Sequence, residues 1–121
     1  MLEVSSKPVL FVKHTCPFCL KLRLYLLEAG LLDSVILCES RTPEEEEAMR
    51  AELSPHLAKV SYPTARFGEE YMTESDDIIA RFARNGGRPP EQLPTYQAYV
   101  DGPFAQLLAL HRENAELKQQ A

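Results

Sequence analysis

Short unbroken apolar runs alternate along the chain with longer stretches that carry apolar residues at helical spacing. Residues 9–12 and 35–38 are apolar without alternation, which is typical of strands buried on both faces. Between them, residues 17–29 place apolar side chains along one helical face, and Gly30 follows as a terminator. A strand–helix–strand unit of this kind predicts parallel strands joined by a right-handed crossover.

A second helix, a hairpin and a third helix are predicted next. Residues 43–53 follow a threonine, start with proline and carry glutamates in their first turn, as helices often do. Two weaker strand signals lie at residues 64–67 and 71–72. Ser75 is then expected to cap a helix that ends at residues 85–87. The predicted order is strand, helix, strand, helix, strand, strand, helix.

The first predicted helix carries a second apolar row, made up of Leu20, Leu24, Leu27 and Leu31. A helix that is apolar nearly all round is usually covered on more than one side. Residues 86–95 are rich in proline and glycine and are interpreted as a surface linker. Beyond them a helix, interrupted at residues 101–103, aligns Phe104, Leu107 and Leu108. We expect it to cover the second row, within one chain or across a homodimer.

These patterns divide the chain into residues 1–87, a compact domain, and residues 88–121, a linker and helical extension packed on the same domain. The 121 residues carry a net charge of −5, with 45% hydrophobic and 26% charged residues, close to the average for one globular domain. No run approaches a membrane span of about 18 apolar residues, and the N-terminus shows no secretory pattern. We therefore expect a cytoplasmic protein without a membrane partner. No segment is basic, which argues against nucleic-acid binding.

The cysteines supply the candidate chemistry. Cys16 and Cys19 form a Cys-x-x-Cys motif, and Cys38 stands alone. In a cytosolic protein this spacing indicates redox or metal chemistry. The motif lies at a helix start, where free N–H groups stabilise a thiolate, and Lys13 adds a positive charge. Cys19 is one turn further on, close enough to attack a mixed disulfide at Cys16. We predict Cys16 as nucleophile and Cys19 as resolving thiol.

Three motifs carry a family resemblance. Residues 13–19 read Lys-His-Thr-Cys-Pro-Phe-Cys and resemble the glutaredoxin pattern Lys-x-Thr-Cys-Pro-Tyr-Cys. Residues 61–63 resemble the glutaredoxin Thr-Val-Pro turn, whose proline is cis. Residues 73–76 resemble the Glu-Ser pair of glutathione S-transferases and the Cys-Ser/Thr-Asp of glutaredoxins. Over residues 8–85 the chain resembles glutaredoxins and, equally, the N-terminal glutathione-binding domain of glutathione S-transferases.

This resemblance implies an α/β, thioredoxin-like fold of order βαβαββα: a mixed four-stranded sheet with helices on both faces, plus the C-terminal helical extension. The implied function is that of a glutathione-dependent thiol–disulfide oxidoreductase. Glutathione would be its co-substrate, and disulfides or mixed disulfides its substrates. No metal is expected, and the protein would be a monomer or a homodimer.

The resemblance also implies a glutathione site, formed by Lys13, Phe18, Tyr62, Pro63, Glu74, Ser75 and Asp76. The backbone before a cis Pro63 would pair with the cysteinyl part of glutathione. Ser75 at a helix start would hold the γ-glutamyl carboxylate, and Glu74 or Asp76 its ammonium group. Lys13 would meet the glycyl carboxylate. The chain lacks the Gly-Gly that usually precedes the acidic cap of glutaredoxins, which points toward the transferase-like branch.

Two other functions compete with the oxidoreductase. The first is a non-catalytic or weakly catalytic glutathione S-transferase-like module that binds or regulates a partner, motivated by the leucine-rich first helix and the C-terminal helix. The second is a metal site, since His14, Cys16, Cys19 and Cys38 are of the types that zinc prefers. A related variant is an iron–sulfur cluster bridged by two copies of Cys16 and two glutathiones.

Overall fold

The computed structural model describes residues 7–120 and contains one mixed sheet of four strands. The first six residues of the predicted domain lie outside the described residues, as does Ala121. The strands are β1 (Val9–Lys13), β2 (Ile36–Ser40), β3 (Thr64–Phe67) and β4 (Glu70–Thr73). They lie in the order β2-β1-β3-β4, with β1 parallel to β2 and antiparallel to β3, and with β4 antiparallel to β3.

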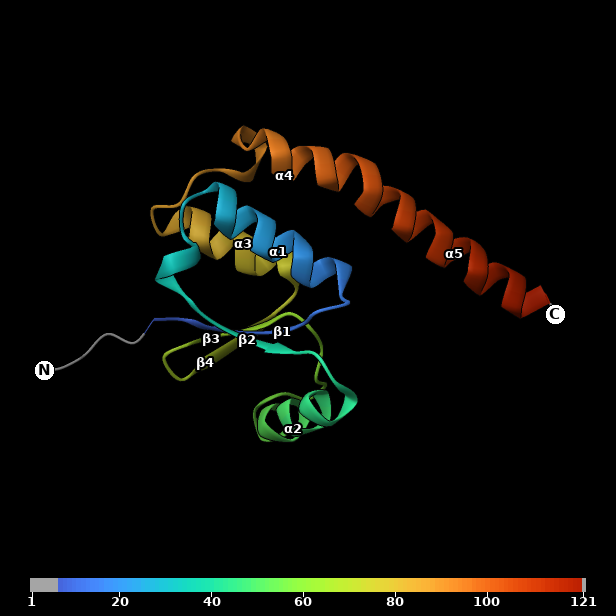
Figure 1. Ribbon diagram of the computed structural model, residues 1–121, viewed down its shortest axis with the longest axis horizontal. Helices are drawn as coiled ribbons and strands as arrows, with labels where there is room; N and C mark the ends of the chain where they lie inside the picture. Colours follow the sequence, from blue (N-terminus) through green and yellow to red (C-terminus); the bar gives the residue numbers. More distant parts are fainter. Residues whose placement is uncertain (1–6, 121) are drawn as a thin grey trace, which may run out of the picture.

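Helices cover both faces of this sheet, as Figure 1 shows. On one face lie α1 (Pro17–Glu28) and α3 (Ser75–Arg84), and on the other lies α2 (Pro43–Leu53). Because successive strand residues point to opposite faces, Leu10 packs under α1 and α3 whereas Phe11 packs with Leu53 of α2. This explains the unbroken apolar run of β1. The predicted order of elements and the thioredoxin-like fold are confirmed.

The start of α3 differs from the prediction. Glu74, not Ser75, is the cap residue, since the Glu74 carbonyl accepts the first helical hydrogen bond from the Ile78 N–H at 3.0 Å. The backbone of Glu74 has φ +75°, a conformation rare for residues other than glycine, and it turns the chain from β4 into the helix. Ser75 is therefore the first helical residue, and it is buried.

Past α3 the chain forms a 3₁₀ turn (Pro90–Gln92), α4 (Pro94–Tyr99), a π-helical turn (Val100–Phe104) and α5 (Ala105–Gln120). The Glu28 carboxylate at the end of α1 accepts hydrogen bonds from the N–H groups of Thr95 at 3.0 Å and Tyr96 at 2.7 Å. The Tyr96 ring meets the edge of Tyr25, with ring centroids 6.0 Å apart. These contacts join α4 to α1. The division of the chain at residue 87 stays a prediction.

Gly87 fixes the point where the extension leaves α3. A β-carbon at this position would lie 2.7 Å from the Phe82 carbonyl oxygen and 2.8 Å from the Tyr25 hydroxyl. That same hydroxyl donates a hydrogen bond of 2.7 Å to the carbonyl oxygen of Arg88. Only glycine fits between these groups, so the chain passes directly over Tyr25.

Within one chain, the C-terminal helix leaves two of the four leucines of the second apolar row of α1 uncovered, and covering across a homodimer stays a prediction. Leu20 is 45% exposed and Leu27 61% exposed. The chain does not break at residues 101–103, because a π-helical turn accommodates Pro103 and continues α4 into α5. In Figure 1, α5 extends away from the body of the protein. Phe104, in the π-helical turn before α5, is buried and packs against Phe18, with ring centroids 5.1 Å apart.

Candidate active site

Cys16 lies between the end of β1 and the first turn of α1, where it is the cap residue of the helix. Its N–H donates to the Lys13 carbonyl at 3.2 Å, which closes the turn after the strand. The Cys16 Sγ atom accepts a hydrogen bond from the Cys19 N–H at 3.3 Å and lies 3.8 Å from the Tyr62 carbonyl oxygen. The thiol is partly exposed, so a ligand can reach it.

This environment favours a thiolate. The side-chain hydrogen bond from Cys19 lowers the pKa of Cys16 to about 6, against the opposing effect of partial burial. The N–H groups of Cys19 and Phe18 and the charge of Lys13 lower this pKa further. A large fraction of Cys16 is therefore thiolate at neutral pH.

Cys19 has the opposite environment. It is fully buried, and its Sγ atom accepts from the Lys13 N–H at 3.5 Å. The hydrogen bond to Cys16 and burial raise the pKa of Cys19. The two thiols are close to each other but are not joined as a disulfide. Cys38 is half-buried in β2, in a different apolar cluster, and burial raises its pKa.

A groove of about 200 Å³ opens between α1, the residues before β3 and the start of α3, and the Cys16 thiol lies next to Tyr62, one of its lining residues. We call it the cis-proline groove; its lining residues are Phe18, Ser61, Tyr62, Pro63, Glu74 and Ser75. The Tyr62–Pro63 peptide bond is cis, as the resemblance implies. All of the lining residues except Ser61 belong to the predicted glutathione site, so five of its seven residues come together here. Ser61 is part of the motif at residues 61–63 but was not predicted as a site residue. Phe18 is 40% exposed because it faces this groove.

Two of the predicted site residues, Asp76 and Lys13, are not among the residues that line the groove. Asp76 pairs with Lys21, which is buried in α1 and was not predicted as part of the site. Lys21 also lies over the Phe104 ring, 4.9 Å from its centroid. The Lys13 ammonium group lies over the Tyr62 ring, 5.7 Å from its centroid.

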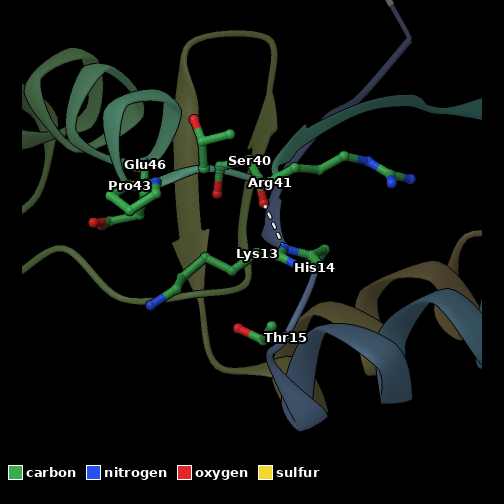
Figure 2. A pocket seen from close by; sticks show the side chains of 8 residues that line it. Lys13, His14, Thr15, Ser40, Arg41, Pro43 and Glu46 are labelled. Atoms are coloured by element: carbon green, nitrogen blue, oxygen red, sulfur yellow. Dashed lines mark hydrogen bonds between the residues drawn. The ribbon is translucent and has the colours of Figure 1, made fainter.

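Two further hollows adjoin Lys13. The first, of about 290 Å³, lies between the ends of β1 and β2 and the start of α2. In Figure 2 the Lys13 side chain extends toward Pro43 and Glu46, Arg41 points the other way, and His14 faces the Ser40 carbonyl at 3.4 Å.

The second hollow, of about 240 Å³, borders Cys16 and is called the extension pocket here. Tyr99 and Leu107 of the extension line it, and the Tyr99 hydroxyl donates to the Pro17 carbonyl at 3.0 Å. The sequence analysis missed Tyr99, since nothing local in the sequence pairs it with a residue 82 positions away.

The proposed zinc ligands His14, Cys16, Cys19 and Cys38 do not converge. Among residues 7–120, no group of three or more His, Cys, Asp or Glu side chains is placed to hold a metal ion. Over the same part of the chain, no helix has both the length and the apolar character needed to cross a membrane.

The chain is thus a protein of thioredoxin-like fold, with Cys16 at the start of α1 and the cis peptide bond of Pro63 just before β3. Within that class, the family model for the N-terminal domain of glutathione S-transferases matches residues 15–85. The chain therefore belongs to this family, which confirms the resemblance drawn from its motifs.

Solved structures agree with this assignment. A trimeric glutathione transferase of Leishmania, TDR1, is 27% identical with a TM-score of 0.50, and the match covers 70% of this chain and 18% of that one. Glutathione transferase Omega 3C from Trametes versicolor is 22% identical with a TM-score of 0.55, covering 81% of this chain and 43% of that one. Oxidized glutaredoxin 2 from Chlamydomonas reinhardtii is 24% identical with a TM-score of 0.51, covering 66% and 73%. The last two show the fold alone.

The chain thus spans less than half the length of the two transferases. A comparison with curated proteins gave no match.

Proposed function

We propose that this protein is a glutathione-dependent thiol–disulfide oxidoreductase in which Cys16 is the nucleophile. The observation that carries the proposal is the Cys16 thiol itself: its pKa is lowered to about 6, and its sulfur lies 3.8 Å from the carbonyl oxygen of Tyr62, which lines the cis-proline groove. The Cys16 thiolate attacks the glutathione sulfur of a mixed disulfide, and the other thiol leaves as a thiolate. A second glutathione then attacks glutathionylated Cys16, which releases oxidised glutathione and restores the thiolate.

The cis-proline groove would hold glutathione during this reaction. The backbone of Tyr62, whose carbonyl oxygen lies 3.8 Å from the Cys16 sulfur, would pair with the cysteinyl part of the tripeptide. Ser75 and the free N–H groups at the start of α3 would bind the γ-glutamyl carboxylate. Glu74 and Asp76 supply negative charge for the ammonium group, and Lys13 supplies positive charge for the glycyl carboxylate.

Cys19 has two roles in this proposal. While Cys16 is free, Cys19 stabilises the thiolate through its hydrogen bond. After Cys16 has reacted, Cys19 can attack the mixed disulfide and form an intramolecular disulfide, a route in which the protein resolves its own intermediate. Burial and a raised pKa slow this second route, so we propose that glutathione resolves most turnovers.

The test measures glutathione-linked reduction of a small mixed disulfide by the wild type and two variants. Cys16→Ser should abolish the activity, and mass spectrometry should find glutathione on Cys16 of the wild type. Cys19→Ser should keep part of the activity, since glutathione replaces it as the resolving thiol. Cys38→Ser is the control and should match the wild type. Full activity of Cys16→Ser would rule out the mechanism.

A second candidate is a glutathione-binding module that acts through a partner, with little turnover. The exposed apolar side chains of α5 favour it, because Leu110 is 57% exposed and Leu117 62% exposed on a helix that extends from the body. Glutathione binding without measurable disulfide reduction would decide for this candidate. Both functions are compatible with the proposed cytoplasmic location.

A further inference from the structure

One face of α1 presents a thiol, an apolar side chain and a cation in line. Cys16, Leu20 and Arg23 are separated by four and then three residues, so they lie on the same side of the helix. All three line the extension pocket. A rise of 1.5 Å per residue places the backbone of Arg23 about 10 Å beyond that of Cys16, and helical side chains lean back toward the N-terminus. The guanidinium group therefore lies several ångströms along the pocket from the sulfur.

The opposite wall of the pocket comes from the helical extension. Tyr99 and Leu107 face the α1 side chains across a space of about 240 Å³. With Leu20, Leu107 makes the middle of the pocket apolar, whereas Tyr99 places a hydroxyl group near the sulfur, where it contacts the Pro17 carbonyl at 3.0 Å. The pocket thus has a polar end at the thiol, an apolar middle and a charged far end.

The charge of the pocket is positive. Lys13 and Arg23 line it, and among the described residues of its lining none is acidic. Behind Arg23 lies Glu39, whose two carboxylate oxygens contact Arg23 at 2.9 Å and Arg41 at 3.1 Å. A single carboxylate shared by two guanidinium groups leaves a net positive charge at this end. An anionic ligand is therefore favoured over a cationic one.

We propose that the extension pocket binds the half of the mixed disulfide that is not glutathione, and that it selects organic thiols in which an apolar chain of about five carbons separates the sulfur from a carboxylate. This inference rests on the proposed function. In the first step the Cys16 sulfur bonds to the glutathione sulfur, the old S–S bond breaks, and its electron pair leaves with the organic thiolate in the pocket. Leu20 and Leu107 contact the chain, and Arg23 binds the carboxylate, while Lys13 stays with the glycyl carboxylate of glutathione.

The experiment compares mixed disulfides of glutathione with 6-mercaptohexanoate, 6-mercaptohexanol and 6-aminohexanethiol. The end group is far from the sulfur in all three, so their uncatalysed reactivity toward thiols is similar, and each rate is divided by that uncatalysed rate. The kcat/KM of the wild type should be highest for the carboxylate and lowest for the amine, with about a tenfold difference between them. Equal values for the three would overturn the inference and leave the oxidoreductase intact. No reduction of any substrate would instead overturn the proposed function.

Matched variants test whether residues of the extension pocket cause the preference for the carboxylate substrate. Arg23→Gln should remove the preference for the carboxylate substrate over the amine, whereas Arg23→Lys should retain it. Arg84→Gln removes the same charge at an exposed site on α3 and should leave this preference unchanged. Leu107→Ala should lower kcat/KM for all three hexyl substrates but not for a short hydroxyethyl substrate, whereas Leu117→Ala on the exposed part of α5 should lower neither. Thermal unfolding of Arg23→Gln and Arg23→Lys shows whether loss of the Glu39 contact affects the fold. A preference that persists in folded Arg23→Gln would show that the extension pocket does not cause it.

Discussion

The Nζ atom of Lys21 lies 2.5 Å from Oδ1 of Asp76, although the Lys21 side chain is only 7% exposed and that of Asp76 is 79% exposed. This ion pair joins the middle of α1 to the first turn of α3, next to Ser75, which lines the cis-proline groove. Asp76 therefore has a structural partner before any ligand binds. Its substitution should affect both the stability of the fold and the affinity for glutathione.

Asp76→Ala should lower the free energy of unfolding by about 1–3 kcal/mol, because it leaves the buried Lys21 ammonium group without its carboxylate. Denaturant unfolding measures the effect. The double variant Lys21→Met/Asp76→Ala should recover part of the loss, since the buried charge is then gone. If the single and double variants are equally destabilised, the ion pair contributes nothing to the fold.

Alkylation by iodoacetamide should select Cys16. Its reaction rate should rise with pH to a half-maximal value near pH 6, because its pKa is lowered to about 6 and the thiolate is the reactive form. Lys13→Gln should move this midpoint upward. Cys19 and Cys38 should react slowly at neutral pH, since the pKa of each is raised. Peptide mapping identifies the alkylated residue, and earlier labelling of Cys19 would contradict the assigned roles.

The same pKa links the stability of the reduced protein to pH. The Cys16 thiol has its ordinary pKa near 9 in the unfolded chain and a pKa of about 6 in the fold. A lowered pKa stabilises the fold fully above the unfolded value, and this contribution is lost as the pH falls toward 6. The stability of the wild type relative to Cys16→Ser should therefore increase from pH 6 to pH 9. A constant difference over this range would show that the fold does not favour the thiolate.

Ser75→Ala should weaken glutathione binding several-fold, since it removes one hydrogen-bonding group of about 1 kcal/mol from the cis-proline groove. Calorimetric titration of the wild type and the variant measures the change. Ser54→Ala, at an exposed position after α2, is the control. Identical affinities of all three proteins would exclude Ser75 from the binding site.

Removal of the extension should destabilise the protein according to where the chain is cut. A chain that stops after Gly87 loses Leu93, Tyr96 and Phe104, which are buried, and should lose several kcal/mol, since each such side chain contributes about 1.5–3 kcal/mol. A chain that stops after residue 109 keeps these side chains and should unfold within about 0.5 kcal/mol of the full chain. Equal stability of all three chains would show that α4 does not stabilise the domain.

The sequence predicted the sheet well because its signals are local. An unbroken apolar run, as in residues 9–12, occurs in strands that are covered on both faces, and the structure buries Leu10 and Phe11 on opposite faces. The place of Cys16 could be predicted for the same reason, since the end of a strand and a proline at a helix start are neighbours in the sequence.

The features that were missed depend on distant contacts. Lys21 is buried because Asp76 and Phe104 pack on it, and the local sequence of α1 contains no sign of either. The path of α5 depends on a π-helical turn at Pro103, where proline and glycine normally indicate a break. Ser75 was placed one residue wrong because Glu74 adopts a backbone conformation that its residue type disfavours.

The close fit at Gly87 fixes the orientation of the extension, which forms one wall of the extension pocket. A flexible linker would let α4 sample many orientations, and each ligand would have to select one of them at a cost in conformational entropy. Here the chain directly after α3 is held between Phe82 and Tyr25, and Glu28 accepts hydrogen bonds from the start of α4. The wall that carries Tyr99 and Leu107 is therefore preorganised, and binding free energy goes into contacts with the ligand instead of into ordering the protein.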